Sequence, residues 1–113
     1  ILESYGAGNA PDRDPTLIEQ LTKANADGIV LAASSQSPRG HVTLGAYATG
    51  AGLARAGVIG ALDMTFEALF VKLHHLFAMG LSPDEVKKTL LTSLSGEVTL
   101  PCDALAGQVI PIF

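Results

Sequence analysis

One continuous apolar run, IVLAA at residues 29–33, limits the fold of this chain more than any other feature. It follows Gly28, a residue typical of a helix end, and precedes the polar segment SSQSPRG at residues 34–40. A strand without polar alternation is typical of the centre of a parallel sheet, where both faces are buried. We therefore predict a central strand here, a sheet covered on both faces, and a polar loop after the strand.

Helix and strand signals alternate along the whole chain. ILESY at the start predicts a first strand, and Asp14 followed by Pro15 predicts a helix N-terminus. The next elements expected are a helix over about 45–56 and a short strand in VIGAL at 58–62. A helix over 65–79, capped by Asp63 or Thr65, should follow. The last helix should begin at the capping box SPDE at 82–85, be lined by Val86, Leu90 and Leu94, and end at Gly96. This order predicts a small three-layer α/β/α domain, flavodoxin- or Rossmann-like, with a parallel sheet of about four strands and helices on both faces.

Composition narrows the choice of partners. Charged residues make up 16% of the 113 residues, whereas an ordinary soluble domain has about 25%. The shortage predicts that a neighbouring domain or subunit covers part of the surface. The net charge of −4, without a Lys/Arg cluster, argues against nucleic acid, and no apolar run is long enough for a membrane span. A single cysteine, Cys102, fits a reducing compartment.

Two polar loops follow predicted strands, at residues 6–13 and 34–41, and ligands bind at the carboxyl ends of parallel strands. In the first loop, GAGN, glycine lets Asn9 present a carboxamide that both donates and accepts hydrogen bonds. A simple glycine turn is the alternative. A dinucleotide fingerprint is disfavoured because Pro11 stands where its third glycine belongs.

The remaining polar residues do not form a catalytic set. Ser34, Ser35 and Ser37 lack the G-x-S-x-G elbow of a serine nucleophile. His74 and His75 are adjacent on a predicted helix and diverge by about 100°, so they are a poor metal site. We expect no metal, no cofactor and no catalytic residue in this chain. It is therefore either a binding module or one half of an enzyme.

Several segments, in order and spacing, resemble the C-terminal domain of cytoplasmic-type (type I) L-asparaginases. These are ESYGAGNAP, GIVLAASSQSPRGHV, YATGAGLARAGVIGALDMTFEALFVKL and GLSPDEVKKTLLTSLSGE. The resemblance implies that residues 1–113 are this domain, with a core over about 1–99 and a tail over 100–113. The first residue is not Met and already belongs to a strand, so we expect the sequence to begin within a longer protein.

The resemblance also implies a function. Type I asparaginases hydrolyse L-asparagine to L-aspartate and ammonia, with a threonine nucleophile in an N-terminal domain that is absent from this chain. Lys72 and Thr65 match none of the family's catalytic positions, so the chain alone is expected to be inactive. Asn9 and Gly8 match the family's GxGN turn beside the substrate, and Tyr47 matches a position that reaches toward the neighbouring site. The implied partners are L-asparagine, the N-terminal domain and further copies, as a cytoplasmic homodimer or tetramer.

Some bacterial members bind asparagine at an allosteric loop after the second strand. The matching residues here are Ser35, Gln36 and Ser37, a candidate allosteric loop. Glu3 stands where those members have an arginine, and its carboxylate would repel the carboxylate of the ligand. We therefore expect that asparagine does not regulate this protein.

Two other functions remain open at this point. One is a free-standing flavodoxin-like module that binds a small metabolite or dimerises, and the other is an interaction module without a ligand. The sequence upstream of Ile1 would separate them from the asparaginase reading, because only the latter requires a threonine-bearing domain there.

Overall fold

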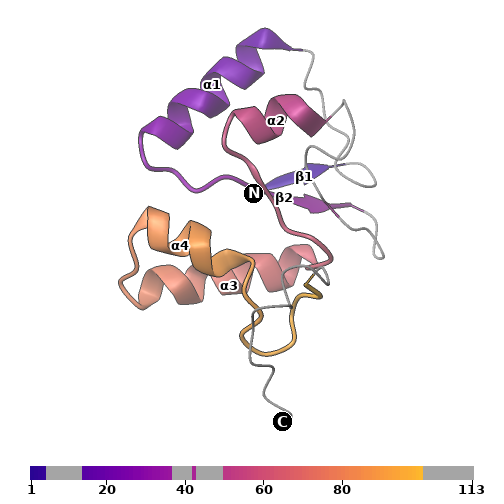
Figure 1. The fold of residues 1–113 in the computed structure, drawn as a ribbon, viewed down its shortest axis with the longest axis vertical. Helices are drawn as coiled ribbons and strands as arrows, with labels where there is room; N and C mark the ends of the chain where they lie inside the picture. The colour runs from indigo at the N-terminus through magenta and orange to yellow at the C-terminus, as the bar shows by residue number, and fades with distance from the viewer. Residues whose placement is uncertain (5–13, 37–41, 43–49, 101–113) are drawn as a thin grey trace.

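A parallel sheet with helices on both faces forms this domain (Figure 1), in a computed structural model that describes residues 1–4, 14–36, 42 and 50–100. The strands are β1 (Leu2–Ser4), β2 (Ala32–Ser35) and β3 (Ile59–Gly60), in the order β1-β2-β3. Both strand pairs are parallel. The predicted α/β class is confirmed, and the described residues contain three strands where the sequence predicted about four.

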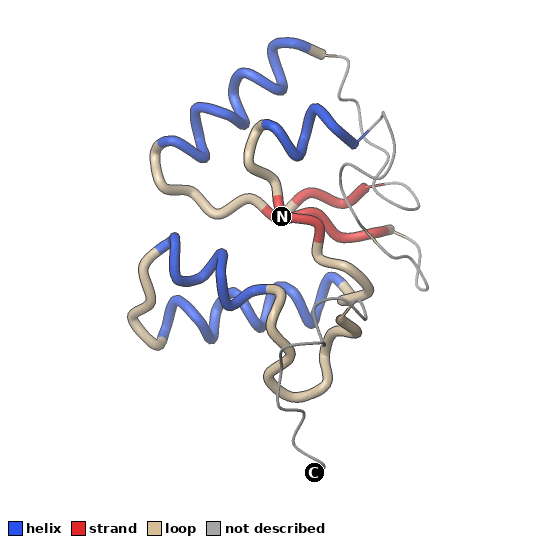
Figure 2. The backbone as a smooth tube through the Cα atoms, in the orientation of Figure 1, coloured by secondary structure: helices blue, strands red, loops and turns tan. Residues whose placement is uncertain are grey.

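The helices form two layers. Helices α1 (Pro15–Ala26) and α2 (Ala51–Arg55) lie on one side of the sheet, and α3 (Phe66–Ala78) and α4 (Pro83–Leu90) lie on the other (Figure 2). The chain steps from β1 to β2 to β3 in one direction, so crossovers of the same hand place α1 and α2 on the same face. None of these helices is long and apolar enough to cross a membrane within the described part of the chain.

Strand β2 occupies the centre of the sheet, as predicted, and divides the core in two. Ala32 faces a cluster that includes Leu69 of α3 and Leu90 of α4, whereas Ala33 faces a cluster with Leu53 of α2. Successive residues of a strand point to opposite faces, and alanine lets a helix approach each face closely. Ala32 and Ala33, which are adjacent on β2, therefore contact apolar clusters on opposite faces of the sheet.

The limits of β2 differ from the predicted ones. The strand begins at Ala32 rather than at Ile29, which is 53% exposed, and it includes Ser34 and Ser35, which were predicted to lie in a loop. Pairing explains the shift, because the partners in β1 and β3 lie opposite residues 32–35. Val30 and Leu31 pack against the core clusters, and the Leu31 carbonyl accepts a hydrogen bond from the Ile59 N–H of β3 at 2.9 Å.

Most of the predicted helix ends are confirmed. Asp14 caps α1 by accepting a hydrogen bond from the Thr16 N–H at 2.9 Å, and Ser82 and Glu85 form the capping box of α4. Of the two caps considered for α3, Thr65 is the one used, and Asp63 instead accepts from the Thr99 N–H at 2.7 Å.

Two helix lengths need comment. Helix α4 ends at Leu90, not near Gly96, and Leu94 is 50% exposed rather than lining the core. The cause is Glu97, whose carboxylate accepts hydrogen bonds from backbone N–H groups after the helix and turns the chain. Helix α2 covers residues 51–55 of the predicted 45–56, and residues 43–49 lie outside the described part.

Gly57 allows α1, α2 and α4 to meet. Its φ of +95° is in the left-handed region, and a Cβ there would lie 2.4 Å from Nδ2 of Asn25. Asn25 in turn accepts a hydrogen bond from the Lys87 ammonium at 2.7 Å. A side chain at position 57 would therefore displace the amide that connects α1 to α4.

Candidate functional site

The carboxyl edge of β1 and β2 is the candidate site. Ser4 of β1 lies opposite Ser35 of β2, so the two strands end side by side. The two loops predicted from sequence to hold a ligand, at residues 6–13 and 34–41, lie for the most part outside the described residues. The register thus places Ser4 beside Ser35 at the carboxyl ends of β1 and β2.

Hydrogen bonds hold the two strand ends together. The Ser4 hydroxyl donates to the Ser34 carbonyl at 3.1 Å, and the Gln36 N–H donates to the Ser4 carbonyl at 2.8 Å. The Gln36 side-chain amide also donates to the Glu3 carbonyl at 3.4 Å. Ser4 is 1% exposed, so its hydroxyl acts inside the fold and not as a surface group. These hydrogen bonds therefore hold the carboxyl ends of β1 and β2 together.

Ser34 carries an unusual hydroxyl at this edge. The residue is fully buried, and its Oγ has no hydrogen-bond partner among the described residues. It lies on the same face of the sheet as Ala32, toward α3, and is paired with Glu3 of β1. Among the described residues, Ser34 therefore places a polar atom in a layer that is mostly apolar.

The structure brings some of the predicted site residues together. Glu3, Ser35 and Gln36 meet at the edge, Ser35 half-buried and the other two exposed. Asn9, Gly8, Tyr47 and Ser37 lie outside the described residues. Among the residues that the structure describes, no group of three or more His, Cys, Asp or Glu side chains could hold a metal ion.

A buried ion pair on α3 was not predicted. The Lys72 ammonium lies 2.7 Å from Oε1 of Glu97, with the two side chains 3% and 14% exposed, and it also donates to the Thr92 carbonyl. Glu97 accepts further hydrogen bonds from the N–H groups of Leu94 and Ser95. The pair attaches the segment after α4 to α3. The sequence carried one signal: Lys72 lies between Leu69 and Leu76 on the core-facing side of a helix, where an unpaired lysine is rare.

Glu97 makes stability depend on pH. Burial raises the pKa of Glu97, but the hydrogen bonds from Lys72, Leu94 and Ser95 outweigh it and lower the pKa from 4.5 to about 2. A lowered carboxyl pKa stabilises the fold above pH 4.5, and this contribution is lost as the pH falls toward 2. We expect the free energy of unfolding to drop by about 3 kcal/mol over this range.

Urea unfolding measured at several pH values between neutrality and this acid range would test the expectation. Glu97→Gln should flatten the pH dependence, because it removes the titrating group and keeps an oxygen acceptor. Glu19→Gln, at an exposed position of α1, is the matched control and should leave the slope unchanged. Equal slopes in all three proteins would contradict this role of Glu97.

The family-model comparison decides where this domain belongs. Residues 1–90 match the family described as the glutaminase/asparaginase C-terminal domain. The chain belongs to this family. The match spans both strand ends of the candidate site and all four described helices of the asparaginase C-terminal domain.

Individual relatives agree with the family assignment. This asparaginase C-terminal domain is 44% identical over 99 residues to L-asparaginase 1 of Escherichia coli K12, a match that covers 88% of the chain and 29% of that protein. It superposes on the crystal structure of L-asparaginase I from Vibrio cholerae with a TM-score of 0.82 and 45% identity, covering 88% of this chain and 30% of that one. It is also 37% identical over 102 residues to a mouse protein named 60 kDa lysophospholipase, covering 89% of the chain and 18% of that protein. The chain thus spans less than a third of each of these relatives.

Proposed function

We propose that this chain is the C-terminal domain of a type I L-asparaginase, a longer protein that converts L-asparagine and water to L-aspartate and ammonia. The observation that carries the proposal is the match of residues 1–90 to the glutaminase/asparaginase C-terminal domain, a stretch that includes the GAGN sequence. The family match and the 29% coverage of the Escherichia coli enzyme support a domain that works with a further one. The nucleophile belongs to that further domain.

In this proposal, the loops at the edge contact the substrate. Asn9 offers its carboxamide to the polar groups of the amino acid, and Gly8 leaves room for the substrate beside the backbone. Tyr47 offers a hydroxyl toward the neighbouring site. The family match over residues 1–90, which include all three residues, supports these assignments.

The proposal includes self-association, as a homodimer or tetramer, and a cytoplasmic location. The low charged fraction, 16%, and the exposed phenylalanines of α3 support a covered surface. The single cysteine fits a reducing compartment.

An ammonia-release assay tests the activity. The purified chain is expected to release no ammonia from L-asparagine above background, whereas the longer protein that contains it should do so. Rates of the longer protein should rise hyperbolically with asparagine, because Glu3 lies exposed beside Gln36 and disfavours a second asparagine there. A longer protein that folds and leaves asparagine intact would refute the activity, and a sigmoidal curve would refute the absence of regulation.

A further inference from the structure

A hollow of about 400 Å³ lies between α3 and the segment that follows α4. Ala68, Val71 and His75 of α3 line it together with Leu94 of that segment, and the ion pair of Lys72 and Glu97 also contributes to its lining. We call it the outer hollow. Val71 and Leu94 are 65% and 50% exposed. Large apolar side chains that gather at a hollow, rather than standing singly, indicate a surface that another apolar segment covers.

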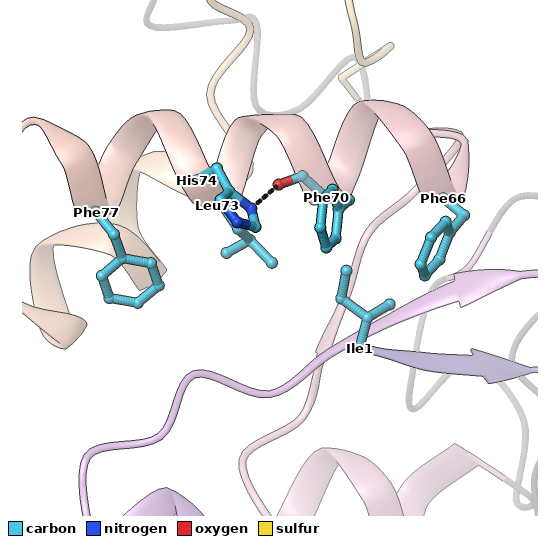
Figure 3. Close-up of a pocket in the computed structure, with 6 residues that line it drawn as sticks. All are labelled: Ile1, Phe66, Phe70, Leu73, His74 and Phe77. Atoms are coloured by element: carbon cyan, nitrogen blue, oxygen red, sulfur yellow. Dashed lines mark hydrogen bonds between the residues drawn. The ribbon is translucent and has the colours of Figure 1, made fainter.

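A second, larger groove lies on a different side of α3 (Figure 3). Its volume is about 470 Å³, and it is lined by Ile1, Phe66, Phe70, Leu73, His74 and Phe77. This groove includes Ile1, so any residues that precede Ile1 in the longer protein of the proposed function start beside it. The outer hollow instead includes Leu94 and Glu97, which belong to the segment that leads into the tail. The two surfaces therefore adjoin opposite ends of the chain.

The structure fixes the point from which the tail departs. The Thr99 N–H donates to the Asp63 carboxylate at 2.7 Å, and the leucine that follows Thr99 is buried in the core. Asp63 lies just before the start of α3, so the tail from residue 101 onward, which lies outside the described residues, begins beside that end of the helix. The hollow extends along α3 from Ala68 to His75, about 11 Å of helix axis. Thirteen extended residues span at most about 45 Å, so the tail is long enough to reach the hollow.

The end of the tail is strongly apolar. It reads QVIPIF at residues 108–113, and Asp103 is the one charged residue after Leu100. Apolar side chains of this size gain free energy when a surface removes them from water. Pro111 favours an extended backbone and lacks an N–H, so this stretch needs no strand partner in order to pack. The tail also follows residue 90, where the family match ends, so it is a feature of this chain beyond the matched family domain.

We propose that residues 109–113 fold back and pack into the outer hollow of the same chain, covering Val71 and Leu94. The docking is intramolecular, so the tether keeps the segment at a high effective concentration and a weak contact is enough to hold it. This docking does not depend on the proposed activity. It leaves the phenylalanine groove of α3 uncovered by the tail, as the self-association in the proposed function requires.

Disulfide pairing within the intact chain tests the docking. Ile112→Cys is combined with Val71→Cys or, as the matched control, with Phe70→Cys, in a Cys102→Ser background. Positions 70 and 71 are adjacent and about 100° apart around α3, so the two variants differ in the side of the helix and hardly in tail length. In a glutathione redox buffer, the effective concentration of the thiol at position 112 should be at least about tenfold higher toward position 71 than toward position 70.

Removing an apolar side chain from the hollow or from the tail should abolish this preference. Leu94→Ser, and separately Ile110→Ser, should bring the two effective concentrations within about threefold of each other. Met79→Ser is the control, because Met79 is 62% exposed and does not line the hollow, and it should leave the preference unchanged. Circular dichroism of each variant confirms that it is folded, and Ile110→Ser keeps the test valid if Leu94→Ser does not fold.

Each other occupant of the hollow has its own result. Equal effective concentrations toward positions 70 and 71 overturn the docking, and a higher value toward position 70 overturns it in favour of the phenylalanine groove. Disulfide-linked dimers in place of the internal disulfide would mean that a second copy fills the hollow, which overturns the docking as well. The same pairs in the longer protein should keep the preference, and its loss there would overturn the docking in favour of another domain. None of these measurements involves ammonia release, so failure of the docking and failure of the proposed function are distinguishable.

Discussion

Replacing Lys72 by methionine is expected to lower the free energy of unfolding by about 3–5 kcal/mol. The ammonium of Lys72 is 2.7 Å from the Glu97 carboxylate, which is only 14% exposed, so its removal leaves a poorly solvated charge without its cation. The Thr92 carbonyl also loses its donor. Methionine keeps much of the volume between Leu69 and Leu76, so the loss reports the charge and not a cavity.

Urea denaturation followed by circular dichroism gives the measurement, with Lys23→Met as the control. Lys23 is exposed on α1, and its replacement should change stability by no more than about 0.5 kcal/mol. The double variant Lys72→Met/Glu97→Gln should recover part of the loss, because it removes the uncompensated carboxylate and retains an acceptor for the Leu94 and Ser95 N–H groups. Equal stabilities of the Lys72→Met and Lys23→Met proteins would show that the pair does not stabilise the fold.

Replacing Asn9 by alanine in the longer protein is expected to reduce kcat/KM for asparagine by about 10- to 100-fold. This is the effect of removing one or two hydrogen bonds to a charged amino acid, worth about 1.5–3 kcal/mol in total. The prediction follows from the proposed function, in which Asn9 contacts the substrate from the loop after β1. Steady-state rates of ammonia release provide the measurement.

Gln20→Ala is the control for this substitution. Gln20 lies exposed on α1 and is not among the residues of the candidate site. Its replacement should leave kcat/KM within about threefold of the parent value, a change below about 0.7 kcal/mol. An Asn9→Ala enzyme as active as the Gln20→Ala enzyme would remove Asn9 from the site.

Much of the domain could be predicted from short stretches of sequence. Asp14 with Pro15, and Ser82 with Glu85, begin helices because their side chains satisfy backbone N–H groups within three residues. The apolar run before Ser34 placed a strand at the centre of the sheet, because such a run needs cover on both faces. The ordered motifs then identified the family, which the comparison confirms. The contacts proposed for Asn9, Gly8 and Tyr47 rest on those motifs and stay predictions.

Other features depend on neighbours that are distant in sequence. Glu97 follows Lys72 by 25 residues, so no helical spacing reveals the pair. The extent of β2 depends on which residues of β1 and β3 lie opposite, which is why Ser34 and Ser35 join the strand and Ile29 does not.

Local sequence alone determined where helices begin, because helix caps depend on contacts within a few residues. It also indicated which segment forms the central strand and which family the motifs match. Only the tertiary structure decided which face of α3 is buried. The helix has apolar residues on two sides, and the position of the sheet selects Leu69 and Leu76 for the core while Phe66, Phe70 and Phe77 remain exposed. The same packing determines that Lys72 points inward to Glu97, because a side chain's surroundings depend on what the rest of the fold places opposite it.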